Sequence, residues 1–200
     1  MFIYMDYLKQ FKNDKTIFFL EIGAYDGKSF DGLYKYTHSN NWTGIFVEPI
    51  KEYYDKLKLN FQNIENKFYE NSAITDENKQ YDIKRIIGDK KWMAGSSSIL
   101  DNSITKKHPY YLEKINGITF DFLVDKYLIT KIDILQIDTE GYDLKILKQI
   151  IPRFKPKFIS IEQRHLIYPD KMEVKKILRN NGYFIKNCKD GGHNYLCWAI

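Results

Sequence analysis

The sequence predicts an α/β protein: a three-layer α/β/α sandwich around a mainly parallel seven-stranded sheet that closes with an antiparallel C-terminal hairpin. Short apolar runs, typical of parallel strands buried on both faces, alternate with segments of helical periodicity along most of the chain. Such alternation favours a parallel sheet with right-handed crossovers. The last two apolar runs, residues 183–187 and 194–200, are close enough in sequence to form a hairpin.

The N-terminal third contains three predicted strands and the helices between them. Residues 5–12 favour a short helix within a leading segment, 1–16. Pro49 favours the start of a helix because its fixed φ suits a first helical turn. Tyr54, Leu57 and Phe61 then follow at helical spacing. The predicted elements are strands at 17–22, 44–48 and 67–70 and helices at 27–37 and 51–62.

The segment from about residue 75 to 118 is the least regular part of the sequence. Residues 80–87 are compatible with an outer strand, whereas 92–98 and 106–109 are typical of loops. Long loops inside a compact domain are usually functional or mobile. We therefore expect this segment to be an irregular insertion that serves the functional site.

Regular elements return after residue 118. Thr119 is a typical N-cap, and Asp121 is favourably placed in the first turn of the helix that follows. A later helix stops before Pro152, and Gly182 marks the end of another. The predicted elements are helices at 119–127, 142–151 and 171–180 and strands at 132–137, 157–162, 183–187 and 194–200.

Composition indicates a single globular domain that spans residues 1–200. Its 44% hydrophobic and 28% charged residues are ordinary values, and the chain is long enough to form a substantial core. The net charge of +5 is spread over scattered lysines, which argues against nucleic-acid binding. No apolar run is long enough to span a membrane and no signal peptide is apparent, so we expect a cytoplasmic protein. Cys188 and Cys197 are expected to be reduced thiols on the hairpin.

The first strand and the turn after it are the most informative segment. Strand 17–22 runs into Gly23 and Gly27. Glycine at the carboxyl end of a buried strand permits a sharp turn and the close approach of a ligand. Ligands of open α/β sheets bind at this edge. The turn therefore predicts a site for a nucleotide-like cofactor.

Glycine spacing separates the kinds of cofactor that such a turn can bind. The dinucleotide fingerprint G-x-G-x-x-G, started at Gly23, meets Tyr25 and Lys28 where it requires glycine. The phosphate loop G-x-x-x-x-G-K-[ST] is closer, because Gly27-Lys28-Ser29 supplies its second half. Three residues, not four, separate Gly23 from Gly27, so the backbone N–H groups are out of step with the phosphates. A phosphate-loop nucleotide-binding protein remains an alternative.

Two acids near the turn favour a cofactor without phosphates. Glu21 precedes Gly23 and can lie near a cationic amine. Glu48 ends the second strand and can accept both hydroxyls of a ribose, as strand-end carboxylates do in dinucleotide folds. S-adenosyl-L-methionine has an adenosine, an amino-acid tail and a sulfonium, and it has no pyrophosphate. It fits this pattern best.

Six motifs follow one another between residues 17 and 165. The strongest are LEIGAYDG at 20–27, VEP at 47–49 and ILQIDTEGYD at 134–143, and further ones are GSSSIL at 95–100, TFDFL at 119–123 and ISIE at 159–162. In this order they resemble the motifs of the FkbM-type methyltransferases. Two positions depart from the family pattern: Glu21 stands where the family usually has Asp, and Gln136 replaces a common Lys.

The resemblance implies a class I methyltransferase fold, which is Rossmann-like, and S-adenosyl-L-methionine as the cofactor. It also implies methylation of a hydroxyl oxygen on a sugar, a glycan or another small-molecule acceptor. Because a fold does not fix a function, a non-catalytic cofactor- or partner-binding module on the same fold is a second alternative.

Four residues are candidates for the chemistry. An activated methyl donor leaves the protein to align the acceptor and to help remove its proton. Asp138 and Glu140 end one regular strand, and Glu162 and His165 follow the next strand towards the same edge. His165 has the intrinsic pKa of a base. The same four residues can instead hold a divalent cation that activates the hydroxyl, although we expect no metal.

The remaining candidates lie along the cofactor and the acceptor. Ser72 and Ala73 suit an adenine edge, because a small residue leaves room and a hydroxyl can hydrogen-bond. Residues 92–98 and 106–111 are expected to form an acceptor lid, on which Lys106, Lys107 and His108, with Arg164 nearby, can favour an anionic acceptor. The predicted cofactor-binding residues are Glu21, Gly23, Ala24, Tyr25, Gly27, Ser29, Glu48, Pro49, Ser72 and Ala73.

Overall fold

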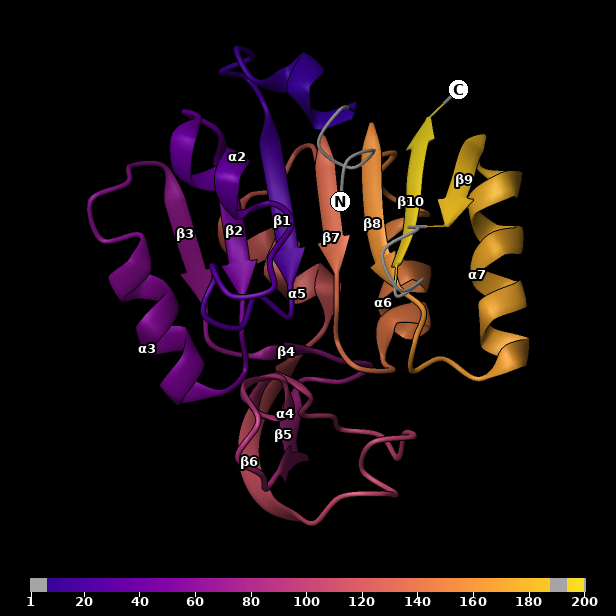
Figure 1. The fold of residues 1–200 in the computed structure, drawn as a ribbon. Coiled ribbons are helices and arrows are strands. Elements are labelled where there is room, and N and C mark those ends of the chain that lie inside the picture. The colour runs from indigo at the N-terminus through magenta and orange to yellow at the C-terminus, as the bar shows by residue number, and fades with distance from the viewer. Residues whose placement is uncertain (1–6, 188–193, 200) are drawn as a thin grey trace.

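A computed structural model describes residues 7–187 and 194–199, and its main sheet has the seven strands that the sequence predicts (Figure 1). The strand order is β3-β2-β1-β7-β8-β10-β9. The first five of these are parallel, whereas β10 is antiparallel to both β8 and β9. The predicted fold class is confirmed. The strands are β1 (Phe18–Ile22), β2 (Thr43–Val47), β3 (Lys67–Glu70), β7 (Ile134–Ile137), β8 (Phe158–Glu162), β9 (Tyr183–Asn187) and β10 (Asn194–Ala199).

Helices cover both faces of this sheet, because alternate residues of each strand point to opposite sides. Leu20 and Ile22 of β1 belong to one buried cluster, which α5, α6 and α7 complete. Phe19 belongs to a second cluster, with residues of α2 and the Leu57 side chain of α3. The helices are α2 (Tyr34–Ser39), α3 (Lys51–Asn60), α5 (Phe120–Tyr127), α6 (Asp143–Ile150) and α7 (Tyr168–Asn180).

Local signals place several helix ends where the sequence predicts them. The Thr119 side chain accepts a hydrogen bond from the Phe122 N–H and caps α5. Gly182 has a φ of +77° just after α7, a conformation that glycine adopts without strain. The helix α7 begins at Tyr168, three residues before the predicted start, and Pro169 lies in its first turn.

The predicted helix 27–37 is wrong, because only α2 forms there. Asp26 accepts hydrogen bonds from the N–H groups of Lys28 and Ser29, and Asp31 accepts one from Leu33. Short acidic side chains that capture nearby N–H groups in this way compete with the helical ladder. Phe30 has a φ of +62° in the same stretch. A turn replaces the first half of the predicted helix.

The leading segment and the hairpin are described in part. A 3-10 helix, η1 (Lys9–Phe11), lies in the predicted helix 5–12, whose first two residues fall outside the described ranges. Cys188 also falls outside them, whereas Cys197 is a buried free thiol. Within the described ranges, every helix is too short or too polar to cross a bilayer.

The segment 75–118 is more regular than predicted. It forms most of a second sheet, in the order β4-β6-β5, from β4 (Ala73–Ile74), β5 (Lys79–Ile86) and β6 (Tyr110–Ile118). The predicted outer strand 80–87 corresponds to β5, but α4 (Lys91–Gly95) occupies part of the predicted loop 92–98. Figure 1 shows this layer beyond the arrowheads of β1, β2 and β7. It therefore faces the sheet edge at which ligands bind.

Candidate active site

Two adjoining hollows lie at the carboxyl ends of the parallel strands. The inner pocket encloses about 600 Å³ and the acidic cleft about 1280 Å³, with open solvent included in both. They share Gly23, Tyr25, Gly95, Asp138 and Glu140. The inner pocket is further lined by Ile22, Val47, Glu48, Pro49, Ile50, Ser72, Ala73, Ile74, Ile83, Ser97, Ile99, Thr139 and Tyr142. The acidic cleft is further lined by Glu21, Ala24, Ser29, Phe30, Asp31, Trp92, Ser96, Gln136, Glu162, Arg164, His165 and Asn194.

Glu48 is held in a fixed orientation beside the inner pocket. Its Oε2 accepts the Tyr25 N–H at 2.8 Å, and its Oε1 accepts the Ile50 N–H at 2.8 Å. Burial raises the pKa of Glu48 to about 8, although these two bonds and the charge of Arg85 act in the opposite direction. Each oxygen retains a lone pair for a further donor. The carboxylate is thus preorganised to accept two hydroxyl groups.

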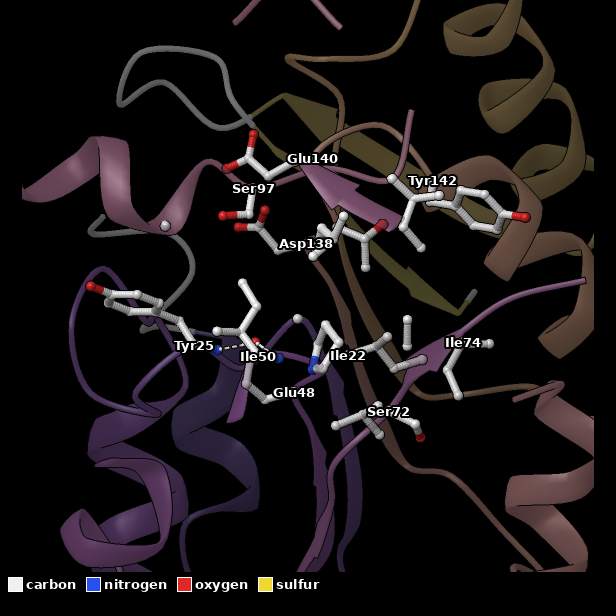
Figure 2. A pocket seen from close by; sticks show the side chains of 18 residues that line it. Ile22, Tyr25, Glu48, Ile50, Ser72, Ile74, Ser97, Asp138, Glu140 and Tyr142 are labelled. Atoms are coloured by element: carbon white, nitrogen blue, oxygen red, sulfur yellow. Dashed lines mark hydrogen bonds between the residues drawn. The ribbon is translucent and has the colours of Figure 1, made fainter. Parts of the chain in front are cut away.

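The rest of the inner pocket is mainly apolar. Figure 2 shows Glu48 and Ser72 on one side and Asp138, Ser97 and Glu140 on the other. The Ser72 hydroxyl donates to Glu70 at 3.0 Å, so its oxygen is left to accept a hydrogen bond. A pocket lined by branched apolar side chains and a few polar groups suits a flat, partly polar ring.

The two glycines of the first turn each leave room for a neighbouring part of the chain. A Cβ on Gly23, which has a φ of +84°, would lie 1.8 Å from the Asp138 carbonyl oxygen. Gly23 therefore lets the neighbouring chain approach, although it also lines both hollows. A Cβ on Gly27 would lie 2.3 Å from Leu57, and Gly27 lines neither hollow. The absence of a Cβ at Gly27 thus makes room for the side chain of α3, and its role at the cofactor stays a prediction.

The backbone N–H groups that a phosphate loop would use are already bonded within the chain. Asp26 Oδ1 accepts the N–H groups of Lys28 and Ser29, at 3.0 and 2.6 Å, and the Ser29 hydroxyl donates to Asp26 Oδ2. A phosphate would need these donors for itself and would meet a carboxylate in their place. The Gly27-Lys28-Ser29 stretch therefore closes an internal turn.

Glu21 shares a hydrogen-bond donor with Asp31, an acid that is not among the residues predicted from the sequence. Gln136 Nε2 donates to Glu21 Oε1 and to Asp31 Oδ1, both at 3.2 Å. The other oxygens, Glu21 Oε2 and Asp31 Oδ2, are buried without a hydrogen-bond partner. Burial raises the pKa of Asp31 to about 7 and that of Glu21 well above its usual value. Two neighbouring carboxyls with spare oxygens can accept hydrogen bonds from a cationic group.

Asp138 lies at the boundary between the two hollows and lines both. Burial, followed by the charges of Glu140, Asp143 and Asp31, raises its pKa well above the usual value. Asp143 caps the turn behind it, because its carboxylate accepts the N–H groups of Thr139 and Gly141. The tight turn after β7 therefore places Asp138 where the two hollows meet.

Glu140 is fixed by the segment between α4 and β6. Its φ of +57° is a left-handed conformation that costs a non-glycine residue of the order of 1 kcal/mol. The Glu140 carbonyl accepts hydrogen bonds from Ser98 Oγ at 2.9 Å and from Asn102 Nδ2 at 2.8 Å. These two side chains hold the strained residue and so aim its carboxylate.

His165 faces Glu140 and Glu162 with one nitrogen and Ser103 with the other. Its Nε2 lies 2.9 Å from Glu140 Oε2 and 3.7 Å from Glu162 Oε1, while Nδ1 is 3.1 Å from Ser103 Oγ. Glu162 Oε2 is buried without a hydrogen-bond partner. Burial raises the pKa of Glu162, the charges of Asp138, Glu140 and Asp143 add to this, and Arg164 opposes it. The four residues predicted to take part in the chemistry thus line one cleft: Asp138, Glu140, Glu162 and His165.

The predicted acceptor lid is only partly present. Trp92, Gly95, Ser96 and Ser97 line one or both hollows, as predicted for 92–98. Residues 106–111 line neither, and the last two of them belong to β6. Of the four basic residues proposed to favour an anionic acceptor, Arg164 alone lines the cleft.

Several lining residues carry no sequence signal that marks them. Asp31 lies in a stretch that periodicity assigns to a helix, and Asn194 comes from the far end of the chain. Both reach the cleft only through the fold. The apolar Ile50 and Ile74, which line the inner pocket, look like ordinary core residues in the sequence.

The family comparison covers most of the chain. The family model "Methyltransferase FkbM domain" matches residues 21–185. Among curated proteins no sequence match is found.

Solved structures share the fold at low sequence identity. A methyltransferase FkbM from Methylobacillus flagellatus KT is 15% identical, with a TM-score of 0.61, over 92% of this chain and 44% of that one. This chain therefore spans less than half the length of that protein. An rRNA methylase from Streptococcus thermophilus is 9% identical (TM-score 0.54, 98% and 92% covered). A precorrin-6y C5,15-methyltransferase from Geobacter metallireducens GS-15 is 10% identical (TM-score 0.52, 98% and 88% covered). Their stated substrates differ, so this likeness concerns the fold alone.

Proposed function

The chain belongs to the FkbM methyltransferase family, and from this we propose that it transfers a methyl group to a hydroxyl oxygen of a sugar or another small acceptor. Its family and its class I methyltransferase fold agree with S-adenosyl-L-methionine as the cofactor. The observation that carries the proposal is the arrangement of acids at one sheet edge. Glu48 lines only the inner pocket, Asp138 and Glu140 line both the pocket and the cleft, and the remaining acids line only the cleft.

The residues present suit the parts of S-adenosylmethionine. Glu48, which two backbone N–H groups hold in place, would accept the two ribose hydroxyls, and Ile50 and Ile74 would contact the adenine. Glu21 and Asp31 would hold the cationic amine, since each has a buried oxygen without a partner. When bound, the cofactor supplies a methyl group on a positively charged sulfur.

The protein must then align an acceptor and remove its proton. The cofactor would supply the methyl group to the acceptor oxygen and leave as the neutral thioether, so a residue of the chain would have to accept the hydroxyl proton. We propose that Asp138 takes the hydroxyl proton, because it lines both the inner pocket and the cleft. Both ring nitrogens of His165 already face other groups, Glu140 and Ser103, which makes it the weaker candidate.

The cleft supports a small polar acceptor. Trp92 and Phe30 offer exposed aromatic faces at its rim, and Asn194 and Arg164 offer hydrogen-bond donors. Aromatic faces with nearby polar groups suit a sugar-like ring. We therefore place the acceptor over the cleft, with its reacting hydroxyl towards Asp138.

The experiment that tests this proposal identifies the product. The protein is incubated with S-adenosylmethionine that carries an isotope-labelled methyl group and with an extract of the source cells, and labelled molecules are found by mass spectrometry. We expect a labelled methyl ether on a small polar molecule. Label on a protein nitrogen or on RNA would contradict the acceptor class.

A binding module without activity predicts another outcome. Calorimetry would then detect S-adenosylhomocysteine binding, whereas no labelled product would form with any extract. Absence of binding by the wild-type protein would contradict the cofactor assignment itself.

A further inference from the structure

We propose that Glu140, Glu162 and His165 form a binding site for one divalent cation of the Mg²⁺ or Mn²⁺ class beside the acceptor position. The expectation from sequence was chemistry without a metal. The arrangement of the three side chains favours the alternative. The inference rests on the proposed function only for the role of the cation, and its binding is tested separately.

The three side chains converge on one point. Each offers one ligand atom, and these atoms all lie within 4.8 Å of one another. Ligands at about 2.1 Å from an ion lie about 3 to 4 Å apart, so small side-chain movements suffice to close the site. The residues come from the turn after β7, the end of β8 and the segment after it. Three separate backbone positions therefore present ligands to the same space.

The contacts within the group leave the carboxylates unsatisfied. Glu162 Oε2 is buried without a hydrogen-bond partner, and only 6% of its side chain is exposed. His165 Nε2 is 2.9 Å from Glu140 Oε2, yet this oxygen also lacks a hydrogen-bond partner. Buried carboxylate oxygens without a hydrogen-bond partner are costly, and a cation would satisfy Oε2 of both glutamates at once.

The support around the group resembles that of a metal site. His165 Nδ1 is 3.1 Å from Ser103 Oγ, which fits an Nδ1–H donor and leaves Nε2 as the ligand. Ser98 and Asn102 fix the Glu140 backbone. All three supporting residues belong to the segment between α4 and β6. The insertion thus orients two of the three proposed ligands.

The donor set indicates the class of cation. Two carboxylates favour hard ions such as Mg²⁺ and Mn²⁺, and an imidazole extends the range towards Mn²⁺. Three protein ligands leave positions open for water or for an acceptor oxygen. A cation at this place would lower the pKa of a bound hydroxyl beside Asp138.

The test measures how much Mn²⁺ binds to the purified full chain without cofactor. The EPR signal of the free ion gives the amount that stays unbound. We expect one ion per chain, and at least about 30-fold weaker binding in Glu162→Gln and in His165→Ala. Ser103→Ala, which removes only the support of His165, is expected to weaken binding about tenfold. Asp121→Asn, which removes an exposed acid that pairs with Arg153 and lines neither hollow, should change the affinity less than about threefold.

Several outcomes would overturn the inference. They are absence of saturable Mn²⁺ binding by the wild type, equal binding by Glu162→Gln, and an equal loss in Asp121→Asn, which would indicate general attraction by acids. Thermal unfolding confirms that each variant folds, and Ser103→Ala decides the matter if the ligand variants do not. S-adenosylhomocysteine binding is measured on the same samples. If it is retained where Mn²⁺ does not bind, this inference fails and the proposed function stands. If Mn²⁺ binds and the cofactor does not, this inference stands and the proposed function fails.

Discussion

Glu48 and Glu162 are two buried glutamates at the same sheet edge, and they differ in what their oxygens contact. Each is 5% exposed, and Glu162 ends β8 whereas Glu48 follows β2. Both oxygens of Glu48 accept a backbone N–H, whereas Glu162 Oε2 has no partner. A satisfied carboxylate suits neutral hydroxyls, and an unsatisfied one in a group of acids suits a cation. The comparison divides the site into a binding side around Glu48 and a reacting side around Glu162.

The largest expected effect is a loss of turnover on substitution of Asp138, which lies between the binding side and the reacting side. Asp138→Asn removes the proposed proton acceptor and should lower turnover about 10³-fold, within the range expected for a general base. Methyl transfer to the identified acceptor and calorimetry with S-adenosylhomocysteine measure the two sides separately. We expect the cofactor affinity to stay within about threefold.

Asp121→Asn, at an exposed acid that pairs with Arg153 far from the hollows, serves as the control and should leave turnover unchanged. If Asp138→Asn weakened cofactor binding by as large a factor as it lowered turnover, the division into a binding side and a reacting side would be wrong.

The next effect concerns the binding side. Glu48→Gln should raise the Kd of S-adenosylhomocysteine about 100-fold, because hydrogen bonds to a charged group contribute about 1.5–3 kcal/mol. Turnover at saturating S-adenosylmethionine should fall much less. Calorimetry and saturation kinetics separate the two quantities.

Glu162→Gln is the matched variant for this experiment, since the same change is made at an equally buried glutamate. It should leave the Kd of S-adenosylhomocysteine within about threefold. Equal effects of the two substitutions on this Kd would refute the comparison.

A smaller effect follows from the pKa of Glu48, which burial raises to about 8 and on which the charges of Arg85 and Glu113 also act. Ribose hydroxyls donate to the ionised carboxylate, so a bound diol lowers this pKa and the affinity rises with pH up to about 8. The Kd of 5′-methylthioadenosine, which has the adenosine and no amino-acid tail, should fall about tenfold between pH 6.5 and 8.5.

The probe matters here, because the amine of the full cofactor titrates in a similar range. In Glu48→Gln the dependence on pH should disappear. A Kd that rises with pH in the wild type would show that the neutral carboxyl is the binding form.

The smallest effect concerns the support of the reacting side. Asn102→Ala removes the hydrogen bond to the Glu140 carbonyl and should lower turnover about three- to tenfold, with cofactor affinity unchanged. Ser96→Ala is the control, because its hydroxyl donates to the Trp92 carbonyl nearby, whereas the Glu140 carbonyl accepts from Ser98 and Asn102. Equal losses in both variants would mean that the segment is merely destabilised.

Much of the fold was predictable because its signals are local. Local sequence patterns marked all seven strands of the main sheet closely, and the Thr119 cap marked the start of α5. The strand-end acids were predictable as a group, since parallel strands end at one edge of the sheet. The helix predicted from residue 27 failed, because Asp26 and Asp31 bind the N–H groups that a helix would use.

What the sequence by itself determined is the sheet, the edge at which its acids meet and the family to which the chain belongs. Only the tertiary structure decided which acids have partners and which do not. The β5–β6 pairing joins residues 79–86 to 110–117, and the segment between them supplies the contacts to Glu140 and His165. The physical reason is that periodicity and capping act over a few residues, whereas burial and pairing depend on positions far apart in the chain. Glu48 and Glu162 look alike as strand-end acids in the sequence, and the fold alone makes them different.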